Sequence, residues 1–208
     1  MKKNVGTKAR PYRMSVRYLV GAVLLAALAG CRSSDLEIDG FHASKGGMDR
    51  TSFALGEDGG DVTFRFDVAD PTPFSAFRGA ERDLESGDRV EVFFSPSAGL
   101  DGDYLCLEID PCGNVLDYRA RFPRRFDYAW RAPKLTVEAS CRADGYTVAG
   151  RIAKDALRAH GIDPDACWIG VFRADFDRDG LVEWYSAMPF CEGPADFHQP
   201  KMFFGRAR

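Results

Sequence analysis

Hydrophobic and polar residues alternate with a period of two along much of the chain, a pattern typical of β-strands with one buried and one exposed face. Within residues 62–68, valines and phenylalanines alternate with threonine, arginine and aspartate. The same alternation runs through Arg89–Phe94 and Tyr104–Asp110, and a Pro-Cys-Gly-Asn turn then leads into Val115–Arg119. The last two of these segments predict a β-hairpin.

The remaining pattern completes an all-β arrangement. A first strand is expected near Leu36–Phe41, and only Ala153–His160, closed by Gly161, is typical of a helix. Further strands are expected at Leu135–Ala139, Tyr146–Ile152, Trp168–Ala174, Val182–Ser186 and Met202–Arg206. About ten short strands with one short helix and no βαβ rhythm predict an antiparallel β-sandwich of jelly-roll type.

The N-terminus predicts export. Six Lys or Arg residues precede an apolar run at Tyr18–Leu28, so residues 1–30 are expected to be a signal peptide. The run of about 11 residues is too short for a spanning helix, which needs roughly 20. Residues 31–50 are then expected to form a tether, merging into the first strand, and 51–208 one folded domain.

The sequence Leu28-Ala29-Gly30-Cys31 resembles the lipobox of bacterial lipoproteins. That resemblance implies a diacylglycerol on Cys31 and a domain tethered to a membrane in the cell envelope. Arg32, in place of an aspartate, favours the outer membrane by the same resemblance. The alternative is an ordinary secretory signal followed by a fortuitous cysteine.

Charge and composition exclude some partners. The composition, with 45% hydrophobic and 28% charged residues, is that of a folded domain. The chain's formal charge is −3, and removing the six basic N-terminal residues leaves −9 for the rest. Phosphate binding needs the opposite sign, so a nucleic-acid partner is disfavoured.

Five cysteines follow Cys31, and their spacing matches neither a zinc site nor a CxxC redox motif. They are Cys106, Cys112, Cys141, Cys167 and Cys191. Cys106 and Cys112 flank a turn and could face each other across the hairpin, whereas buried free thiols are the alternative for any of them. The odd count leaves at least one unpaired, and the pairing stays open.

Catalytic signatures are scarce: the chain has no GxSxG, HExxH, Walker or GxGxxG motif. The three histidines (His42, His160 and His198) are expected to be structural or solvent-exposed. Glu91 and Glu108, on strands that could be neighbours, are the one carboxylate pair that could hydrolyse a glycosidic bond, and ordinary sheet-surface charge is the alternative.

Strand pairing in chain order would gather charged and aromatic side chains on one face. The expected set is Arg65, Asp67, Arg89, Glu91, Tyr104, Glu108, Asp117 and Arg119. Such a face suits sugars, because hydroxyl groups need both donors and acceptors and the C–H face of a sugar needs an aromatic surface. Mutual ion pairs on a solvated sheet explain the same pattern equally well.

A calcium site is a further possibility. Asp175-Phe176-Asp177-Arg178-Asp179-Gly180 matches the first half of a calcium loop, in which alternate carboxylates converge on the ion. Position twelve is Ser186, which supplies no bidentate carboxylate, although Glu183 could substitute. Asp175, Asp177 and Asp179 are therefore candidate Ca²⁺ ligands, with a plain Asp-Gly hairpin turn as the alternative.

Several motifs in order resemble a family 9 carbohydrate-binding module over roughly Phe53–Arg206. They are Asp88-Arg89-Val90-Glu91-Val92-Phe93-Phe94, Tyr104 through Glu108, Asp110, Gly113, Asp117, Trp168–Arg173, and Phe197-His198-Gln199-Pro200 before Phe204-Gly205. The resemblance implies a non-catalytic β-sandwich that binds poly- or oligosaccharides, often at chain ends, and that accompanies glycan degradation. Calcium occurs in such relatives.

This chain departs from that family at the two tryptophans that hold the sugar. Leu84 and Glu85 stand where the first is expected, and Ala187 where the second is expected, about three residues beyond Trp184. The candidate ligand-binding residues are Trp184, Tyr185 and Trp130 for stacking, and Arg89, Glu91 and Tyr104 for hydrogen bonding. The alternative function is an envelope lipoprotein that binds proteins and has lost sugar affinity.

Overall fold

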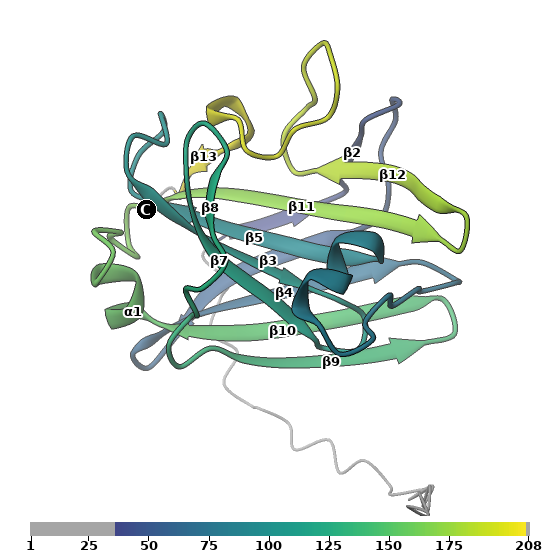
Figure 1. Cartoon of the computed structure of the whole chain (residues 1–208), viewed down its shortest axis with the longest axis horizontal. Coiled ribbons are helices and arrows are strands. Elements are labelled where there is room, and N and C mark those ends of the chain that lie inside the picture. The colour runs from purple at the N-terminus through teal and green to yellow at the C-terminus, as the bar shows by residue number, and fades with distance from the viewer. Residues whose placement is uncertain (1–35, 207–208) are drawn as a thin grey trace, which may run out of the picture. The chain divides into compact units, whose positions relative to one another are not determined.

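The computed structural model describes residues 36–206, which form two antiparallel β-sheets packed as a sandwich (Figure 1). The five-stranded sheet has the order β1 (Leu36–Asp39), β3 (Ser52–Asp58), β4 (Asp61–Ala69), β10 (Gly145–Ala153) and β9 (Thr136–Arg142). The eight-stranded sheet has the order β2 (His42–Ala43), β12 (Gly180–Ser186), β11 (Trp168–Asp177), β5 (Arg89–Ser95), β6 (Asp103–Ile109), β7 (Val115–Arg121) and β8 (Arg125–Asp127), with β13 (Phe204–Gly205) beside β11. The predicted all-β sandwich is confirmed, whereas the predicted signal peptide and the lipid site at Cys31 lie outside the described residues.

Helices are short in this part of the chain. The α-helix α1 covers Lys154–Arg158, less than the predicted Ala153–His160, because the chain leaves the helix before Gly161, which has a φ of +72°. The two 3₁₀ helices are η1 (Glu81–Ser86) and η2 (Pro200–Met202), and η2 takes the start of the strand predicted at 202–206. Within residues 36–206, no helix has the length and apolar character needed to cross a membrane.

The segment predicted as a tether contributes to both sheets. Strand β1 pairs with β3, and β2 pairs with β12. Phe41, between these two strands, is fully buried. Within the described residues, part of the segment predicted as a tether therefore belongs to the sandwich.

The main core lies between the sheets and follows the period-two pattern. On β4, Phe64, Phe66 and Val68 are buried, whereas the intervening residues face outward. Strands β5, β6 and β11 contribute the opposite layer, with Val90, Val92, Phe94, Leu105, Leu107, Ile109, Ile169 and Val171. Burial of these side chains removes apolar area from water at about 25 cal/mol per Å², which is the main stabilisation of the fold.

A second cluster covers the outer face of the eight-stranded sheet. All seven residues of β5 are buried, because residues 187–203, here called the C-terminal segment, pack over this face together with η1. Figure 1 shows this segment in yellow beside β11 and β12. The outer-face cluster comprises Leu84, Phe93, Leu100, Tyr104, Cys106, Leu116, Tyr118, Ala120, Phe172, Phe197, Met202 and Phe203.

The expected single charged face is divided by this topology. Arg65 and Asp67 lie on β4, in the other sheet. On β7, Leu116 and Tyr118 belong to the outer-face cluster, so Asp117 and Arg119 point the opposite way. The outer face of the eight-stranded sheet keeps only Arg89, Glu91, Tyr104 and Glu108 from the predicted set.

Candidate functional site

A cavity of about 130 Å³ opens on the outer face of the eight-stranded sheet. Its walls come from strands β5, β6 and β12, from the connection after β7, and from the C-terminal segment. This outer-face cavity is lined by Arg89, Glu91, Glu108, Arg124, Trp184, Ala195, Asp196, Phe197 and His198.

Arg89 and two glutamates form the floor of the cavity. Glu91 and Glu108 are direct partners in the register of β5 and β6. The Arg89 Nε atom lies 2.9 Å from Glu91 Oε1 and donates a hydrogen bond of 2.7 Å to Glu108 Oε2. The Arg89 Nη1 atom also donates to the carbonyl oxygens of Leu84 and Gly87, which fixes the guanidinium against the end of η1.

The pKa of Glu91 is strongly raised. Burial, together with the negative charge of Glu108, raises the pKa of Glu91 to about 8, although Arg89 opposes the rise. Glu91 Oε1 faces Arg89 as an ion pair and accepts no hydrogen bond from the residues that the structure describes. At neutral pH Glu91 therefore favours its protonated form, beside an arginine that contacts both glutamates.

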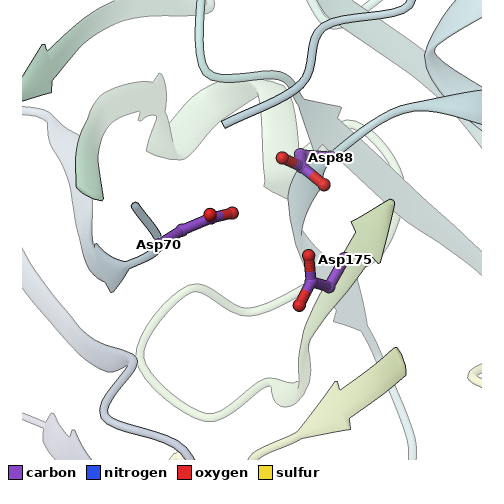
Figure 2. A group of neighbouring side chains, drawn as sticks. All are labelled: Asp70, Asp88 and Asp175. Carbon is purple, nitrogen blue, oxygen red and sulfur yellow. The ribbon is translucent and has the colours of Figure 1, made fainter. Parts of the chain in front are cut away.

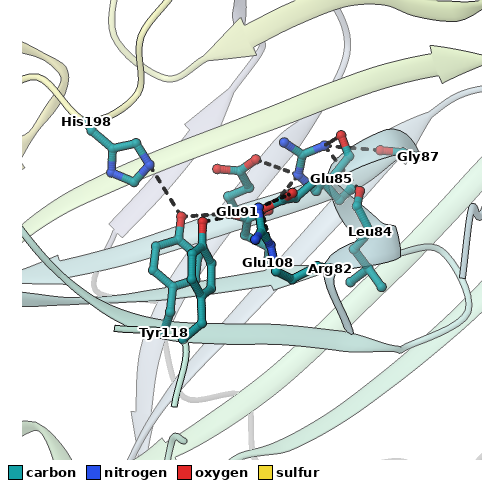
Figure 3. Close-up of polar contacts among 10 residues, drawn as sticks. Arg82, Leu84, Glu85, Gly87, Glu91, Glu108, Tyr118 and His198 are labelled. Carbon is teal, nitrogen blue, oxygen red and sulfur yellow. Dashed lines mark hydrogen bonds and ion pairs between the residues drawn. The ribbon is translucent and has the colours of Figure 1, made fainter. Parts of the chain in front are cut away.

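His198 joins the cavity to the hydroxyl groups of two buried tyrosines. The Tyr104 hydroxyl lies 2.9 Å from His198 Nδ1, and the Tyr118 hydroxyl lies 3.3 Å from His198 Nε2. Tyr118 also donates a hydrogen bond of 2.7 Å to Glu108 Oε1, as Figure 3 shows. Hydrogen bonds thus run from the C-terminal segment through Tyr118 and Glu108 to Arg89.

This chain of contacts fixes the tautomer of His198. Because Tyr118 gives its single proton to Glu108, His198 Nε2 must donate to the Tyr118 oxygen. His198 Nδ1 then accepts from Tyr104, which is the pattern of a neutral imidazole. Burial, with the positive charge of Arg124, lowers the pKa of His198 to about 4, in agreement with a neutral ring.

Trp184 provides the aromatic wall. Its ring is half-buried, meets Phe197 edge-on at a centroid distance of 5.1 Å, and lies 5.5 Å from the Arg89 guanidinium carbon. Arg124 and Asp196 also line the cavity, and Arg124 Nη1 donates a 2.6 Å hydrogen bond to Asp196 Oδ1. The cavity thus has one indole wall and two arginine–carboxylate groups.

The structure brings together some of the predicted ligand-binding residues. Arg89, Glu91 and Trp184 line the outer-face cavity, and Tyr104 is fully buried beneath His198. Tyr185 instead packs against the core between the sheets, with the guanidinium of Arg173 4.8 Å from its ring centre.

Trp130 also lies away from the outer-face cavity. It packs against the core between the sheets, and its indole nitrogen donates a 3.0 Å hydrogen bond to His160 Nε2. Trp130 was predicted to be a surface aromatic because arginines surround it in a loop. Its hydrogen bond to His160 and its apolar packing account for its position instead.

Three cavity residues lacked a specific role in the sequence interpretation: Arg124, Asp196 and His198. They come from loops, where no alternation indicates which way a side chain points. The motif Phe197-His198-Gln199-Pro200 was the available signal for the C-terminal segment, but it did not indicate the hydrogen bonds of His198 to two tyrosines.

The predicted neighbourhood of Glu91 and Glu108 is confirmed, but their expected solvent exposure is not. Glu91 is 2% and Glu108 5% exposed, because the C-terminal segment covers this face. In a glycosidase the substrate lies between carboxyl groups that are about 5 to 9.5 Å apart. Here the guanidinium of Arg89 occupies the space between the two carboxylates.

The acidic residues proposed as calcium ligands do not gather as the sequence predicted. Asp177 Oδ1 accepts hydrogen bonds from the backbone nitrogens of Asp179 and Gly180, which is an Asp-Gly hairpin turn. Asp175 instead meets Asp70 and Asp88, and one carboxylate oxygen from each of the three lies within 4.8 Å of the others (Figure 2).

The cationic side chain of Arg173 already lies beside two members of the three-aspartate cluster. Arg173 Nη2 lies 3.1 Å from Asp70 Oδ2 and 3.5 Å from Asp175 Oδ2. Carboxylate oxygens are the ligands that Ca²⁺ prefers, but a calcium ion here would share two carboxylates with this arginine. Burial and the charges of Asp70 and Asp175 raise the pKa of Asp88 to about 7, although backbone N–H groups of Phe176 and Phe74 oppose the rise. Calcium binding stays a prediction.

Comparisons with known proteins show similarity at the level of fold. No protein-family model and no curated protein matches the sequence. A solved structure of a proposed carbohydrate-binding protein from Bacteroides uniformis has a TM-score of 0.60 and 18% identity, covering 76% of this chain and 78% of that chain.

A family 9 carbohydrate-binding module from Caldicellulosiruptor kristjanssonii is also similar, in two complexes. With glucose, its TM-score is 0.56 at 17% identity, covering 81% of this chain and 82% of that chain. With cellotriose, the TM-score is 0.57 at 16% identity, covering 81% and 80%. The chain therefore has a β-sandwich fold similar to that of family 9 carbohydrate-binding modules.

Proposed function

We propose that the protein is a non-catalytic carbohydrate-binding domain and that the outer-face cavity receives the sugar. The observation that carries this proposal is the position of Trp184 beside the Arg89–Glu91 ion pair, at the wall of one cavity. An indole face packs against the C–H groups of a sugar ring. Guanidinium and carboxylate groups supply the donors and acceptors that hydroxyl groups need.

The size of the cavity favours a small ligand group. Its volume of about 130 Å³ is below the roughly 300 to 1,000 Å³ of pockets that enclose drug-sized ligands. We therefore propose that the cavity takes one sugar residue of an oligo- or polysaccharide, with the rest of the chain outside. The similar structures that hold glucose and cellotriose support this class of ligand.

The proposal excludes hydrolysis by Glu91 and Glu108. Both carboxylates contact the same arginine nitrogen, so neither is free to act on a bond placed between them. A purified sample is expected to release no reducing sugar from any glycan that it binds. Release that disappears in both Glu91→Gln and Glu108→Gln would contradict this part of the proposal.

We propose further that the domain works while tethered to the outer membrane by a lipid on Cys31, in the service of glycan degradation. The support is the leader-like composition of residues 1–30 and the resemblance of residues 28–31 to a lipobox. Radiolabelled fatty acid should label the chain in bacteria and should not label Cys31→Ser. Equal labelling of both, or labelling of neither, would contradict the anchor.

A glycan array tests the proposed function. Labelled chain is applied to plant, host and bacterial glycans, together with Trp184→Ala and, as a matched control away from the cavity, Trp130→Ala. Thermal unfolding first shows that each sample is folded. Binding by the wild type and by Trp130→Ala, but not by Trp184→Ala, supports the proposal. Absence of binding by folded wild type favours the protein-binding lipoprotein instead.

A further inference from the structure

One exposed cysteine lies in a turn of the eight-stranded sheet, and a second, on the edge strand of the five-stranded sheet, contacts the residue before it. Cys112 is in the turn between β6 and β7, and Cys141 is on β9, the edge strand of the five-stranded sheet. All five cysteines of the described residues are free thiols in the structure. Cys106, the partner considered for Cys112 from sequence, is instead fully buried on β6 opposite Tyr118.

The side chain of Cys141 is directed toward the turn that holds Cys112. Val137 and Ala139 on β9 pack against the core between the sheets, and Cys141, two residues further, shares that side of the strand. Its sulfur atom lies 3.5 Å from the carbonyl oxygen of Pro111, and that carbonyl group is bonded to the backbone nitrogen of Cys112.

A second contact shows that the turn lies against β9. Gly113 follows Cys112, and a Cβ atom at this glycine would lie 3.4 Å from Cβ of Ala139. The φ of Gly113 is +85°, so a residue with a side chain would be strained here as well. The residues on both sides of Cys112 therefore lie close to the edge strand: Pro111 contacts Cys141, and Gly113 leaves room for no more than a Cβ atom before Ala139.

The position of Cys112 is fixed by Asp110, which is almost fully buried. Asp110 Oδ1 accepts hydrogen bonds from the backbone nitrogens of Cys112 (2.9 Å) and Asn114 (2.8 Å). Ser75 donates to Asp110 Oδ2, which ties the turn to the loop before η1. Because the backbone of Cys112 is held in this way, a bond from its side chain to β9 costs little additional backbone freedom.

We propose that Cys112 and Cys141 form a disulfide that links the two sheets. The contact of the Cys141 sulfur with the carbonyl oxygen of Pro111 and the closeness of Ala139 to Gly113 place the two cysteines beside each other. The proposed export would bring the chain to a compartment where disulfides persist. The inference concerns the stability of the sandwich and does not depend on sugar binding.

The reaction needs a disulfide oxidant, for which oxidised glutathione serves in vitro. The Cys112 thiol loses a proton and attacks one glutathione sulfur, forming a mixed disulfide and releasing one glutathione. The Cys141 thiol loses its proton and attacks the Cys112 sulfur, releasing the second glutathione. Two thiols are oxidised, and one glutathione disulfide is reduced to two thiols.

The bond would close a loop of about 30 residues between the sheets. Such a cross-link restricts the unfolded chain, and in a domain of this size it should raise the melting temperature by about 5 to 10 °C. The bond would stabilise strand β9 most, because among the described residues this strand pairs with β10 alone. The other exposed cysteine, Cys191, offers a matched control.

The test uses the full chain, reduced and then incubated with oxidised glutathione. Remaining thiols are alkylated in denaturant, and the digested peptides are analysed by mass spectrometry with and without reduction. We expect one cross-linked peptide pair, Cys112 with Cys141, in the wild type and in Cys191→Ser. Neither the cross-linked peptide pair nor the rise in melting temperature should occur in Cys112→Ser or in Cys141→Ser.

Alkylation of both Cys112 and Cys141 after oxidation would overturn the proposal. So would a cross-link from either cysteine to Cys31, to Cys191 or to a second chain in place of the expected pair. The peptide result stands independently of melting, so a variant of lower stability does not obscure the outcome.

Discussion

The Nε atom of Arg89 lies 2.7 Å from Oε2 of Glu108 on the neighbouring strand, and both side chains are buried. The same nitrogen also faces Glu91, so one guanidinium holds two carboxylates at the floor of the outer-face cavity. This arrangement suits recognition of a ligand more than acid–base chemistry, because the arginine occupies the space between the two acids.

Replacing Arg89 should destabilise the fold strongly. Arg89→Met leaves two adjacent buried carboxylates without their cation, and loss of one partner of a buried pair costs about 3 to 5 kcal/mol. Urea unfolding measures this loss. Arg121→Met is the control, because Arg121 pairs with Asp103 at the surface, where such pairs contribute about 1 kcal/mol or less. Equal losses of unfolding free energy in the two variants would show that the buried ion pairs of Arg89 stabilise the fold no more than the surface pair of Arg121 does.

The raised pKa of Glu91 predicts a loss of stability with rising pH. Because the folded-state pKa, about 8, lies above the ordinary value, the folded protein keeps a proton that the unfolded chain has released. The free energy of unfolding should therefore fall between about pH 4.5 and 8 through this group. Urea unfolding at pH 5, 7 and 9 should show the wild type losing stability relative to Glu91→Gln. A constant difference across this range would contradict the assignment.

The lowered pKa of His198 predicts an opposite dependence at acidic pH. The folded-state value of about 4 lies below the ordinary value of about 6.5, so this group's contribution is lost as the pH falls from about 6.5 to 4. NMR of the imidazole should show a neutral ring at pH 5.5. A midpoint near 6.5 in the folded protein, as expected for the urea-unfolded chain, would rule out the buried neutral histidine.

Thermal unfolding with and without Ca²⁺ tests whether the protein binds calcium. If the sequence-based calcium prediction holds, millimolar Ca²⁺ raises the melting temperature, a chelator reverses the rise, and Asp175→Asn abolishes it. Asp88→Asn and Asp179→Asn then distinguish the cluster with Asp70 from the predicted loop, since Asp179 lies in the hairpin turn. An unchanged melting temperature in the wild type would contradict the calcium prediction.

Strand alternation was sufficient to predict the sandwich, and it placed Glu91 and Glu108 on strands that could be neighbours, which they are. It also carried information that the site prediction did not use: consecutive strand residues point to opposite faces, so Trp184 and Tyr185 cannot share one site. The structure places Trp184 at the outer-face cavity and Tyr185 at the inner core, as this rule requires.

The covered outer face could not be predicted from alternation. The polar residues of β5 indicated a solvated face, but the C-terminal segment, which has little regular structure, buries them. Its contacts are long-range: His198 meets Tyr104 across 94 positions, and Arg124 meets Asp196 across 72. Strand alternation reports only on residues that are close in sequence, so it cannot predict such contacts.

Calorimetric titration with the glycan that binds best on the array shows whether the sugar occupies the outer-face cavity. The wild type and Trp130→Ala should bind with the same affinity, and Trp184→Ala should lose at least tenfold, because it removes the aromatic wall of the cavity while leaving the inner core intact. Equal affinity in folded wild type and Trp184→Ala, or loss of binding in Trp130→Ala alone, would show that the sugar does not bind in the outer-face cavity.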